Sequence, residues 1–302
     1  MTAGGVFVTG ATGFIGKHLV AHLKNNIGID AITVLSRNQH PEFKTILCDL
    51  QINSVPNDAL FGIDTIYHLA GYAHDLRDDS SLNHLYQKIN VDATVQFAEL
   101  AVVSGVKNFV FISSVKAGGT EVTGRCMTEE DQFEPEGIYG RTKREAELKL
   151  LNISKHSDMH VSIIRSSLVY GRGVKGNLSL MQEGIRKGWF PPLPEVNNRR
   201  SMIHVDNLVN ALIFVSEDER TNGEIFIASD NHPYSSREIY EASCLIMGKP
   251  IPKWYLPKIF FDILSIFSNR LRYKFAKLFD NEHYSSKKLI LLGYRAKRSL
   301  TD

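Results

Sequence analysis

Short apolar runs alternate with amphipathic segments over the first two thirds of the chain. The runs lie at 6–9, 31–35, 44–47, 65–68, 108–113 and 160–165. Near-continuous apolar runs of this length are typical of strands that are buried on both faces of a sheet. Between them, apolar residues recur at helical spacing over 14–24, 83–104 and 139–155. The alternation predicts an α/β fold: a Rossmann-type, doubly wound parallel sheet with helices on both faces.

The pattern changes after Val169. Proline gathers at 191–194, the connecting segments lengthen, and short helices are predicted at 235–247 and 285–292. A late apolar run at 224–227 predicts one return of the chain to the sheet. We therefore expect a dinucleotide-binding domain at 1–170 with a return over about 201–230, and a smaller, mostly helical substrate-binding lobe at 171–200 and 231–302.

The segment 254–279 is rich in aromatic and basic residues. Two interpretations are open: a helix that lies on a membrane surface, or helical structure that packs the smaller lobe. Pro257 and Asn269 interrupt the apolar pattern, so we favour packing.

Composition narrows the class of protein only a little. The 302 residues are 43% hydrophobic and 23% charged, which is ordinary for a globular protein. A formal net charge of +2 is too small to indicate nucleic acid or a membrane as the main partner. Cys48, Cys126 and Cys244 are widely separated, which predicts reduced thiols rather than disulfides or a metal site. We expect no signal peptide and no transmembrane helix, and hence a cytoplasmic protein.

Three glycines follow the first predicted strand directly. Gly10, Gly13 and Gly16 are spaced three apart, and the first predicted helix begins among them. A helix N-terminus offers free N–H groups and a positive dipole end, and glycine lets the backbone approach a ligand closely. This strand, turn and helix predict a site for the pyrophosphate of a dinucleotide.

A tyrosine and a lysine lie four residues apart at the start of a predicted helix. Tyr139 and Lys143 therefore share one helix face. A lysine ammonium near a phenol lowers the phenol pKa from about 10, which makes tyrosine a usable acid or base. Ser113 and Ser114 follow the apolar run at 109–112, at the strand end where open α/β sheets bind ligands. Each motif is common by itself, and their order in one chain is what favours a catalytic role.

The order of these motifs resembles that of extended short-chain dehydrogenases/reductases of the NAD-dependent epimerase/dehydratase family. The matching segments are TGATGFIG at 9–16, CDL at 48–50, HLAG at 68–71, NV at 90–91, FISS at 111–114, YGRTK at 139–143, VYG at 169–171 and RRSMIHVDNL at 199–208. Within that family, segments 166–181 and 191–212 are most similar to bacterial 4-reductases of UDP-N-acetyl-4-keto-hexosamines, and UDP-glucose 4-epimerase-like proteins are also similar.

The resemblance implies roles for individual residues. Tyr139 would be the catalytic acid/base, Lys143 its electrostatic partner and ribose ligand, and Ser114 a hydroxyl that assists at the substrate. The cofactor-binding residues would be Gly10, Thr12, Gly13, Phe14, Ile15, Gly16, Ser36, Arg37, Asp49, Leu50, Leu69, Ala70, Gly71, Asn90, Ser113, Tyr139 and Lys143. The substrate-binding residues would be Ser114, Lys116, Asn177 and Arg200, and no metal site is expected. His68 is better explained as a strand residue near the cofactor than as a base.

The end of the second predicted strand bears on the choice of cofactor. A site that prefers NAD usually carries an acidic residue there, on the ribose hydroxyls. Ser36 stands in its place and Arg37 follows. Serine can donate a hydrogen bond to a 2′-phosphate and arginine can neutralise it, so we predict NADP(H) over NAD(H). The alternative is that Arg37 stacks on the adenine.

The residues after Ser114 bear on the reaction. Dehydratases of the family carry an acidic pair there, whereas this chain has Val115 and Lys116. The lack of that pair disfavours dehydration. The resemblance, together with the predicted preference for NADP(H), implies NADPH-dependent reduction of the C4 keto group of a nucleotide-linked hexose, a UDP-linked N-acetyl-6-deoxyhexose, in bacterial polysaccharide biosynthesis. An NAD-dependent UDP-hexose 4-epimerase is the main alternative, and a non-catalytic NADP-binding regulator is a lesser one. The family implies a homodimer through 83–104 and 139–155.

Overall fold

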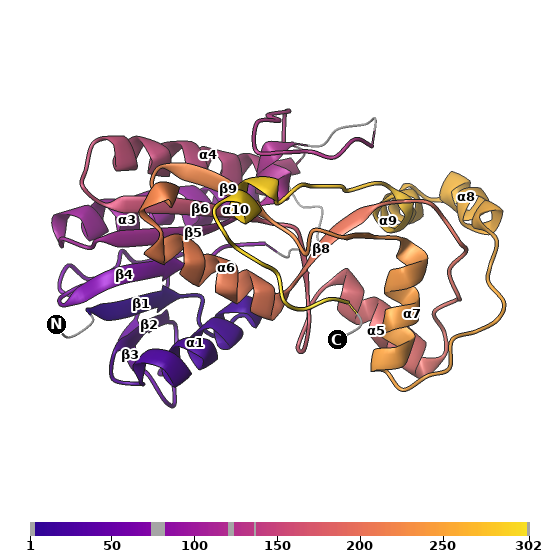
Figure 1. Cartoon of the computed structure of the whole chain (residues 1–302), viewed down its shortest axis with the longest axis horizontal. Coiled ribbons are helices and arrows are strands. Elements are labelled where there is room, and N and C mark those ends of the chain that lie inside the picture. Colours follow the sequence, from indigo (N-terminus) through magenta and orange to yellow (C-terminus); the bar gives the residue numbers. More distant parts are fainter. Residues whose placement is uncertain (1–3, 74–81, 120–123, 136, 301–302) are drawn as a thin grey trace.

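The computed structural model describes residues 4–73, 82–119, 124–135 and 137–300 (Figure 1). In Figure 1 a sheet with its flanking helices occupies one end of the molecule, and a smaller lobe that contains α5, α7, α8 and α9 occupies the other.

The described residues form one seven-stranded parallel sheet in the order β3-β2-β1-β4-β5-β6-β9. Its strands are β1 (Gly5–Thr9), β2 (Ile32–Ser36), β3 (Lys44–Leu47), β4 (Ile63–His68), β5 (Asn108–Ser114), β6 (His160–Ser166) and β9 (Glu224–Ala228). The strand order reverses between β1 and β4, and open α/β sheets bind ligands at such a switch point. The predicted fold class is confirmed, and β9 is the predicted late return to the sheet.

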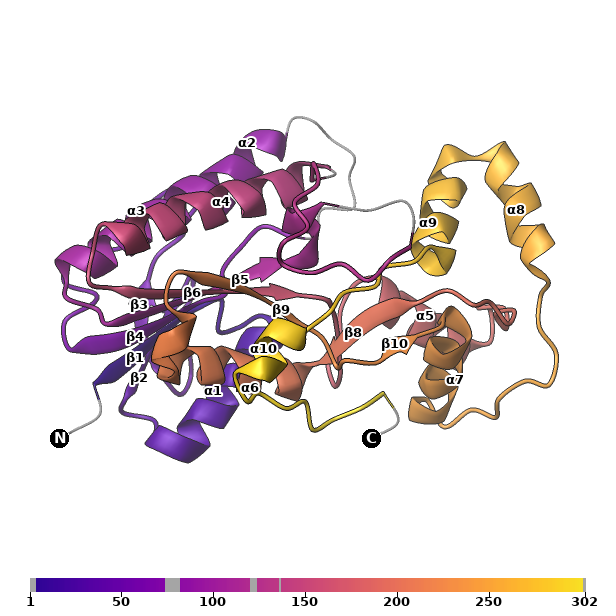
Figure 2. The same ribbon diagram turned by 45° about the horizontal axis from the view of Figure 1, so that its top comes forward.

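Helices cover both faces of the sheet (Figure 2). One face packs against α1 (Phe14–Ile27) and α6 (Val205–Glu217), with the core of this layer centred on buried aliphatic side chains. The other face packs against α3 (Ala93–Val103) and α4 (Gly137–Lys155). The short helix α10 (Lys287–Leu291) lies beside β9. The apolar positions recognised over 14–24, 83–104 and 139–155 contribute to the buried faces of α1, α3 and α4, whereas α6 was not predicted.

The predicted helix at 83–104 is not one regular helix. It consists of α2 (Asn83–Gln87), a π-helical turn at Lys88–Asp92, and α3. Apolar periodicity does not reveal such a turn, because it inserts one residue without ending the helix. The turn carries Asn90, one of the residues predicted for the cofactor.

The described residues also form a second, three-stranded sheet that the sequence analysis did not identify. Its strands are β7 (Leu168–Tyr170), β8 (Arg200–His204) and β10 (Pro233–Tyr234), in the order β10-β8-β7. β7 and β10 have only three and two residues, and only two of the five residues of β8 are apolar. The helices of the lobe are α5 (Asn177–Lys187), α7 (Ser236–Ile246), α8 (Lys258–Phe267) and α9 (Asn269–Phe279).

The segment predicted to pack the smaller lobe divides into α8 and α9 at Ser268. Phe275, Leu278 and Phe279 of α9 pack against the core of the lobe, as expected. For α8 the expectation is largely wrong, because Phe261 is its one buried residue. Among the described residues, no helix combines the length and the apolar character needed to cross a bilayer.

Candidate active site

The glycine turn joins β1 to α1 at the carboxyl edge of the sheet. Gly10 has a φ of 70°, and a Cβ there would lie 2.8 Å from the backbone nitrogen of Ala70. A Cβ at Gly16 would collide with the carbonyl oxygen of Gly10. Both positions need glycine because the turn folds tightly against itself and against the loop after β4. No side chain in the described part of the chain caps α1 at Gly13, so this helix start can bind a phosphate.

The start of α1 also reaches the smaller lobe. Thr12 is exposed in the glycine turn, and Phe14 and Ile15 begin the helix. His18, one turn further on, hydrogen-bonds the Arg172 carbonyl oxygen at 3.0 Å. It also lies 3.1 Å from a carboxylate oxygen of Asp206 at the start of α6. These contacts hold the turn against the segment that connects the sheet to the lobe.

The ends of β2 and β3 lie beside the turn and carry the residues predicted to select the cofactor. Ser36 ends β2, and its hydroxyl accepts a hydrogen bond from the Asn38 backbone at 3.3 Å. Arg37 is exposed, and no carboxylate among the described residues pairs with it. Asp49 and Leu50 follow β3. This edge therefore presents a hydroxyl and a guanidinium at the position where an NAD site usually has a carboxylate.

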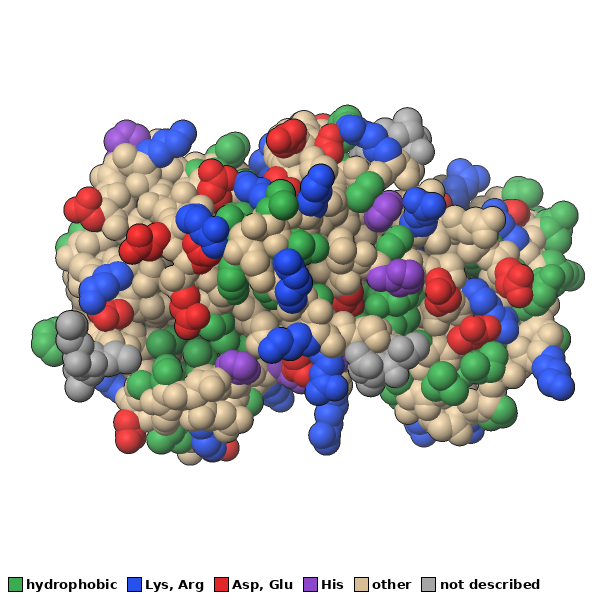
Figure 3. Space-filling view, viewed as in Figure 1, with side chains coloured by type: hydrophobic (Ala, Val, Ile, Leu, Met, Phe, Trp, Pro, Cys, Tyr) green, Lys and Arg blue, Asp and Glu red, His purple; other side chains and the backbone are tan. Residues whose placement is uncertain are grey.

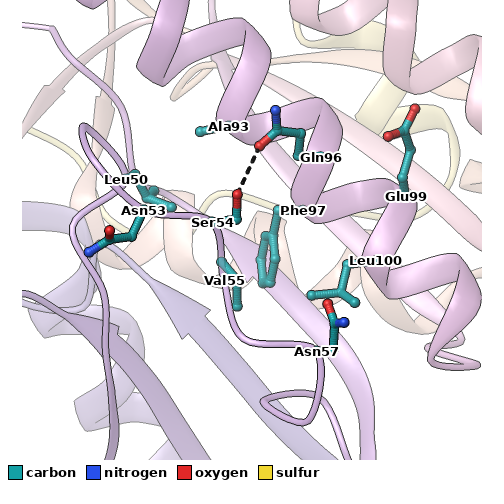
Figure 4. Close-up of a pocket in the computed structure, with 10 residues that line it drawn as sticks. All are labelled: Leu50, Asn53, Ser54, Val55, Asn57, Ala93, Gln96, Phe97, Glu99 and Leu100. Atoms are coloured by element: carbon teal, nitrogen blue, oxygen red, sulfur yellow. Dashed lines mark hydrogen bonds between the residues drawn. The ribbon is translucent and has the colours of Figure 1, made fainter.

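A surface hollow lies next to this edge, between the segment 50–57 and α3 (Figure 4). Leu50 and Val55 line one side and Phe97 the other, and the Ser54 hydroxyl donates to Gln96 at 3.4 Å. Leu50 is the residue that the hollow shares with the predicted cofactor set, and Ser114, Tyr139 and Lys143 do not line it. The hollow is therefore not the reaction centre.

Asn90 fastens the loop after β4 to α4. Its Oδ1 accepts from the Tyr72 backbone at 2.7 Å, and its Nδ2 donates to the Tyr72 carbonyl and to the Thr142 hydroxyl, both at 3.1 Å. A Cβ at Gly71 would lie 3.2 Å from Asn90 Oδ1 and 3.3 Å from Lys143 Nζ. Asn90 therefore helps to position the loop that contains Leu69, Ala70 and Gly71, and its predicted contact with the cofactor stays a prediction.

His68 lies fully buried within the same network. Its ring nitrogens lie 3.0 Å from the hydroxyls of Thr9 and Thr94. Burial, together with the charge of Lys143, lowers the pKa of His68 to about 3. A ring that stays neutral at neutral pH and bonds two threonines is a structural residue, which agrees with the interpretation of it as a strand residue.

Ser114, Tyr139 and Lys143 come together where β5 meets α4. Ser114 ends β5, and its hydroxyl accepts from the Lys116 backbone at 3.3 Å in the short 3₁₀ turn Val115–Gly118. The side chain of Ser114 acts to lower the pKa of the nearby Tyr139 phenol. The Lys143 ammonium donates to the Ile112 carbonyl at 2.9 Å and lies 4.4 Å from the ring centroid of Phe111.

The expected effect of Lys143 on Tyr139 is not found. Burial outweighs the effect of Ser114 and raises the pKa of Tyr139 to about 12. Burial also lowers the pKa of Lys143 to about 8, although Glu147 opposes this. The physical reason is the burial of the phenol, while the Lys143 ammonium donates to the Ile112 carbonyl. Tyr139 therefore carries its proton at neutral pH.

The sequence analysis did not identify a buried ion pair one helical turn beyond Lys143. Glu147 binds Arg165 through two hydrogen bonds, of 2.9 and 2.7 Å, and both side chains are almost fully buried. The spacing of Tyr139, Lys143 and Glu147 at every fourth residue was a signal that could have revealed it. Ser113, which pairs in register with Arg165, has a buried hydroxyl without a hydrogen-bond partner among the described residues.

The predicted substrate residues are spread over three elements. Lys116 is exposed in the 3₁₀ turn, Asn177 is exposed as the first residue of α5, and Arg200 begins β8. Arg200 is 8% exposed and already has an acidic partner, because its guanidinium donates to Glu282 at 2.8 Å. It also donates to the Asp280 carbonyl at 3.2 Å. Sequence reasoning missed Glu282, since the two residues are far apart in the chain.

Three features define the class of protein: the sheet order, the glycine turn at the switch point, and the group of Ser114, Tyr139 and Lys143. They are those of a dinucleotide-dependent oxidoreductase of the short-chain dehydrogenase/reductase type. Comparison with known proteins specifies the class further. Residues 6–228 match the model of the NAD dependent epimerase/dehydratase family. The chain belongs to this family, and the prediction of an enzyme of this kind is confirmed.

Individual relatives are similar over most of the chain. A UDP-glucose 4-epimerase from Vibrio cholerae is 32% identical over 257 residues, which cover 83% of this chain and 78% of the relative. The N-acetyl-alpha-D-glucosaminyl-diphospho-ditrans,octacis-undecaprenol 4-epimerase of Escherichia coli O157:H7 is 27% identical, with 83% and 75% covered. The solved structure of MoeE5 in complex with UDP-glucose and NAD is 25% identical, with a TM-score of 0.77 over 99% of this chain and 95% of that one.

Proposed function

We propose that the protein reduces the C4 keto group of a nucleotide-linked hexose with NADPH, and that the sugar is a UDP-linked N-acetyl-6-deoxyhexose of bacterial polysaccharide biosynthesis. The family and the sugar nucleotides named for the relatives support the broader class of reaction. Within that class, the residues at the end of β2 favour a net reductase. Ser36 and Arg37 replace the carboxylate that favours NAD, and a net reductase consumes NADPH.

The residues at the carboxyl edge of the sheet are suited to bind a dinucleotide. The start of α1 has backbone N–H groups available for the pyrophosphate, and Gly10 and Gly16 leave no side chain in its way. Ser113 has a buried hydroxyl without a partner among the described residues, next to the predicted catalytic Ser114. Ser36 and Arg37 would hold a 2′-phosphate, and Lys143 would bind the ribose.

When bound, NADPH would supply a hydride to C4 of the sugar. Tyr139 would donate its proton to O4, so that the keto group becomes a hydroxyl. A pKa raised to about 12 keeps the phenol protonated before this step, which suits an acid. The Ser114 hydroxyl would hydrogen-bond O4. Val115 is buried and Lys116 is exposed where dehydratases of the family carry acids, and this supports reduction without loss of water.

The cofactor preference tests the proposal. Arg37→Ala should weaken NADPH binding at least tenfold, because a charge-assisted bond to a phosphate contributes roughly 1.5–3 kcal/mol, and should leave NADH binding unchanged. Lys44→Ala is the matched control, since Lys44 is exposed at the opposite end of the neighbouring strand β3. An equal loss for NADPH and NADH would reject the phosphate role.

A 4-epimerase remains the second candidate, because two relatives are named as 4-epimerases. The two reactions differ in their use of cofactor. A reductase consumes NADPH when supplied with a UDP-4-keto-6-deoxy-N-acetylhexosamine, which is followed by absorbance and by NMR of the product. An epimerase carries bound NAD after purification and interconverts UDP-glucose and UDP-galactose with no added cofactor.

We also propose that 171–200 and 231–302 form the substrate-binding lobe, apart from α10, which lies beside β9. Lys116, Asn177 and Arg200 would contact the sugar nucleotide, and the enzyme would be cytoplasmic. The long helices α3 and α4 lie side by side on one face of the sheet and could form a homodimer interface.

A further inference from the structure

Helix α8 presents an apolar face to solvent. The six side chains on that face, each between 45% and 80% exposed, are Ile259, Phe260, Ile263, Leu264, Ile266 and Phe267. With 3.6 residues per turn, they fall on one half of the helix. Figure 3 shows hydrophobic side chains gathered at the end of the molecule where Figure 1 places α8. A contiguous exposed apolar patch of this kind usually marks an interaction site.

The other half of α8 is less apolar and is covered by the protein only in part. Phe261, which is 4% exposed, packs against Phe275 and Phe279 of α9 with ring centroids 5.2 and 5.1 Å apart. Lys258 and Asp262 on the same half form an ion pair of 2.7 Å. A helix that belongs to a core has the reverse arrangement, with its apolar stripe turned inward. One aromatic anchor therefore holds α8 in place while its apolar face remains uncovered.

The surroundings of the apolar face are basic and aromatic. Residues 253–277 include six basic residues and one acidic residue, a net charge of +5 in a chain whose total is +2. Arg272 and Lys274 of α9 are exposed. Trp254 and Tyr255, which precede α8, are 63% and 49% exposed. Apolar, aromatic and basic residues in this combination are typical of helices that lie in the headgroup region of anionic membranes.

We propose that α8 and α9 form a docking surface for an anionic lipid bilayer, with the apolar face of α8 in the interface and the basic residues of α9 on the headgroups. A helix of 10 residues is about 15 Å long, half the hydrocarbon thickness, so α8 lies on the bilayer and does not span it. The positive charge of the segment favours a lipid surface over a second copy of the chain, because two copies meeting there would repel each other.

The docking surface is directly connected to a predicted substrate residue. Helix α9 ends at Phe279, and the carbonyl of the next residue, Asp280, accepts a hydrogen bond from Arg200. The 11 residues of α9 span about 16 Å. A docked bilayer would therefore lie within about one helix length of Arg200. The proposal is independent of the proposed reaction, since docking requires neither cofactor nor sugar.

Vesicle flotation of the full-length protein tests the docking surface. We expect the protein to float with equimolar phosphatidylglycerol–phosphatidylcholine vesicles at low salt and to bind pure phosphatidylcholine more weakly. Phe267→Glu should reduce binding at least tenfold, because it places a charge in the interface and removes an apolar contact. Phe61→Glu is the matched control, as Phe61 is 93% exposed in the sheet half, and it should bind like the wild type.

A double variant that removes two positive charges measures the electrostatic contribution to vesicle binding. Arg272→Gln with Lys274→Gln should weaken binding to the anionic vesicles about fivefold for each charge removed and leave binding to phosphatidylcholine unchanged. Lys44→Gln with Lys155→Gln, two exposed lysines of the sheet half, is the control for net charge. Circular dichroism and thermal unfolding confirm that each variant is folded.

Three results would overturn the proposal. The first is a wild-type protein that stays at the bottom of the gradient with anionic vesicles. The second is an equal loss of binding in Phe267→Glu and Phe61→Glu. The third is a dimer that Phe267→Glu dissociates in the absence of any vesicle binding, which would assign the apolar face to a second copy of the chain.

Discussion

The buried ion pair between Glu147 and Arg165 allows a quantitative test of how the site is supported. Arg165 lies at the end of β6 and Glu147 on α4, and their side chains are 1% and 0% exposed. The guanidinium has one further bond, of 3.3 Å, from Nη2 to Gln132, and its Nη1 lacks a partner among the described residues. Glu147→Gln keeps the shape of the side chain and removes the only carboxylate bonded to this cation within the described structure.

The expected loss of stability is large for one substitution. Removing one member of a buried ion pair leaves an uncompensated charge and costs about 3–5 kcal/mol. This is a substantial part of a typical free energy of unfolding of about 5–15 kcal/mol. For a chain of this size, the midpoint of thermal unfolding should fall by roughly 10 °C. Glu145→Gln is the matched control on α4, since its pair with Lys149 is exposed and contributes at most about 1 kcal/mol.

Urea unfolding followed by circular dichroism measures the change, with unchanged m-values as the check that unfolding stays two-state. The double variant Glu147→Leu, Arg165→Met should recover most of the lost stability, because it removes both charges and fills the same space. The reasoning is refuted if Glu147→Gln unfolds within about 0.5 kcal/mol of the wild type, or if the double variant is less stable than Glu147→Gln.

Two further predictions concern proton transfer and pH. Tyr139→Phe should lower kcat by about 10²- to 10⁴-fold. The dissociation constant for NADPH, measured by fluorescence, should stay within about a factor of two of the wild-type value. Retained turnover would exclude Tyr139 as the acid. Below pH 6.5, His68 should lower the free energy of unfolding as the pH falls. The reason is that the imidazole binds a proton in the unfolded chain, whereas the buried ring stays neutral until the pH reaches about 3. Between pH 6.5 and pH 5 the free energy of unfolding should fall by about 2 kcal/mol. Urea unfolding at pH 7 and pH 5 measures the loss, and an identical loss in His68→Gln would assign it to other groups.

Most of the fold could be predicted from the sequence, since buried parallel strands and amphipathic helices leave local periods in the chain. The glycine turn and the strand end at Ser114 were recognised for the same reason, because turn chemistry is local. β7 and β10 were missed because two or three residues carry no period, and β8 because only two of its five residues are apolar. The π-helical turn was missed because it leaves the apolar spacing nearly intact.

The electrostatics of the site could be predicted only in part. The spacing of Tyr139 and Lys143 correctly placed them on one helix face. It could not show that the Lys143 ammonium would donate to the Ile112 carbonyl, which lies on another element. Arg200 was predicted as a substrate-binding residue, whereas its pairing with Glu282 across 82 positions of sequence depends on how the two segments pack.

The sequence by itself determined the α/β fold, the glycine turn and the residue types of the proposed catalytic set, because each is specified by residues a few positions apart. The tertiary structure alone decided where charges are directed: Lys143 onto the sheet, Arg165 onto Glu147, and Arg200 onto Glu282. It also decided that the apolar face of α8 points outward. An amphipathic pattern states that one face is apolar, but whether that face meets a core or the surroundings depends on which elements pack against it.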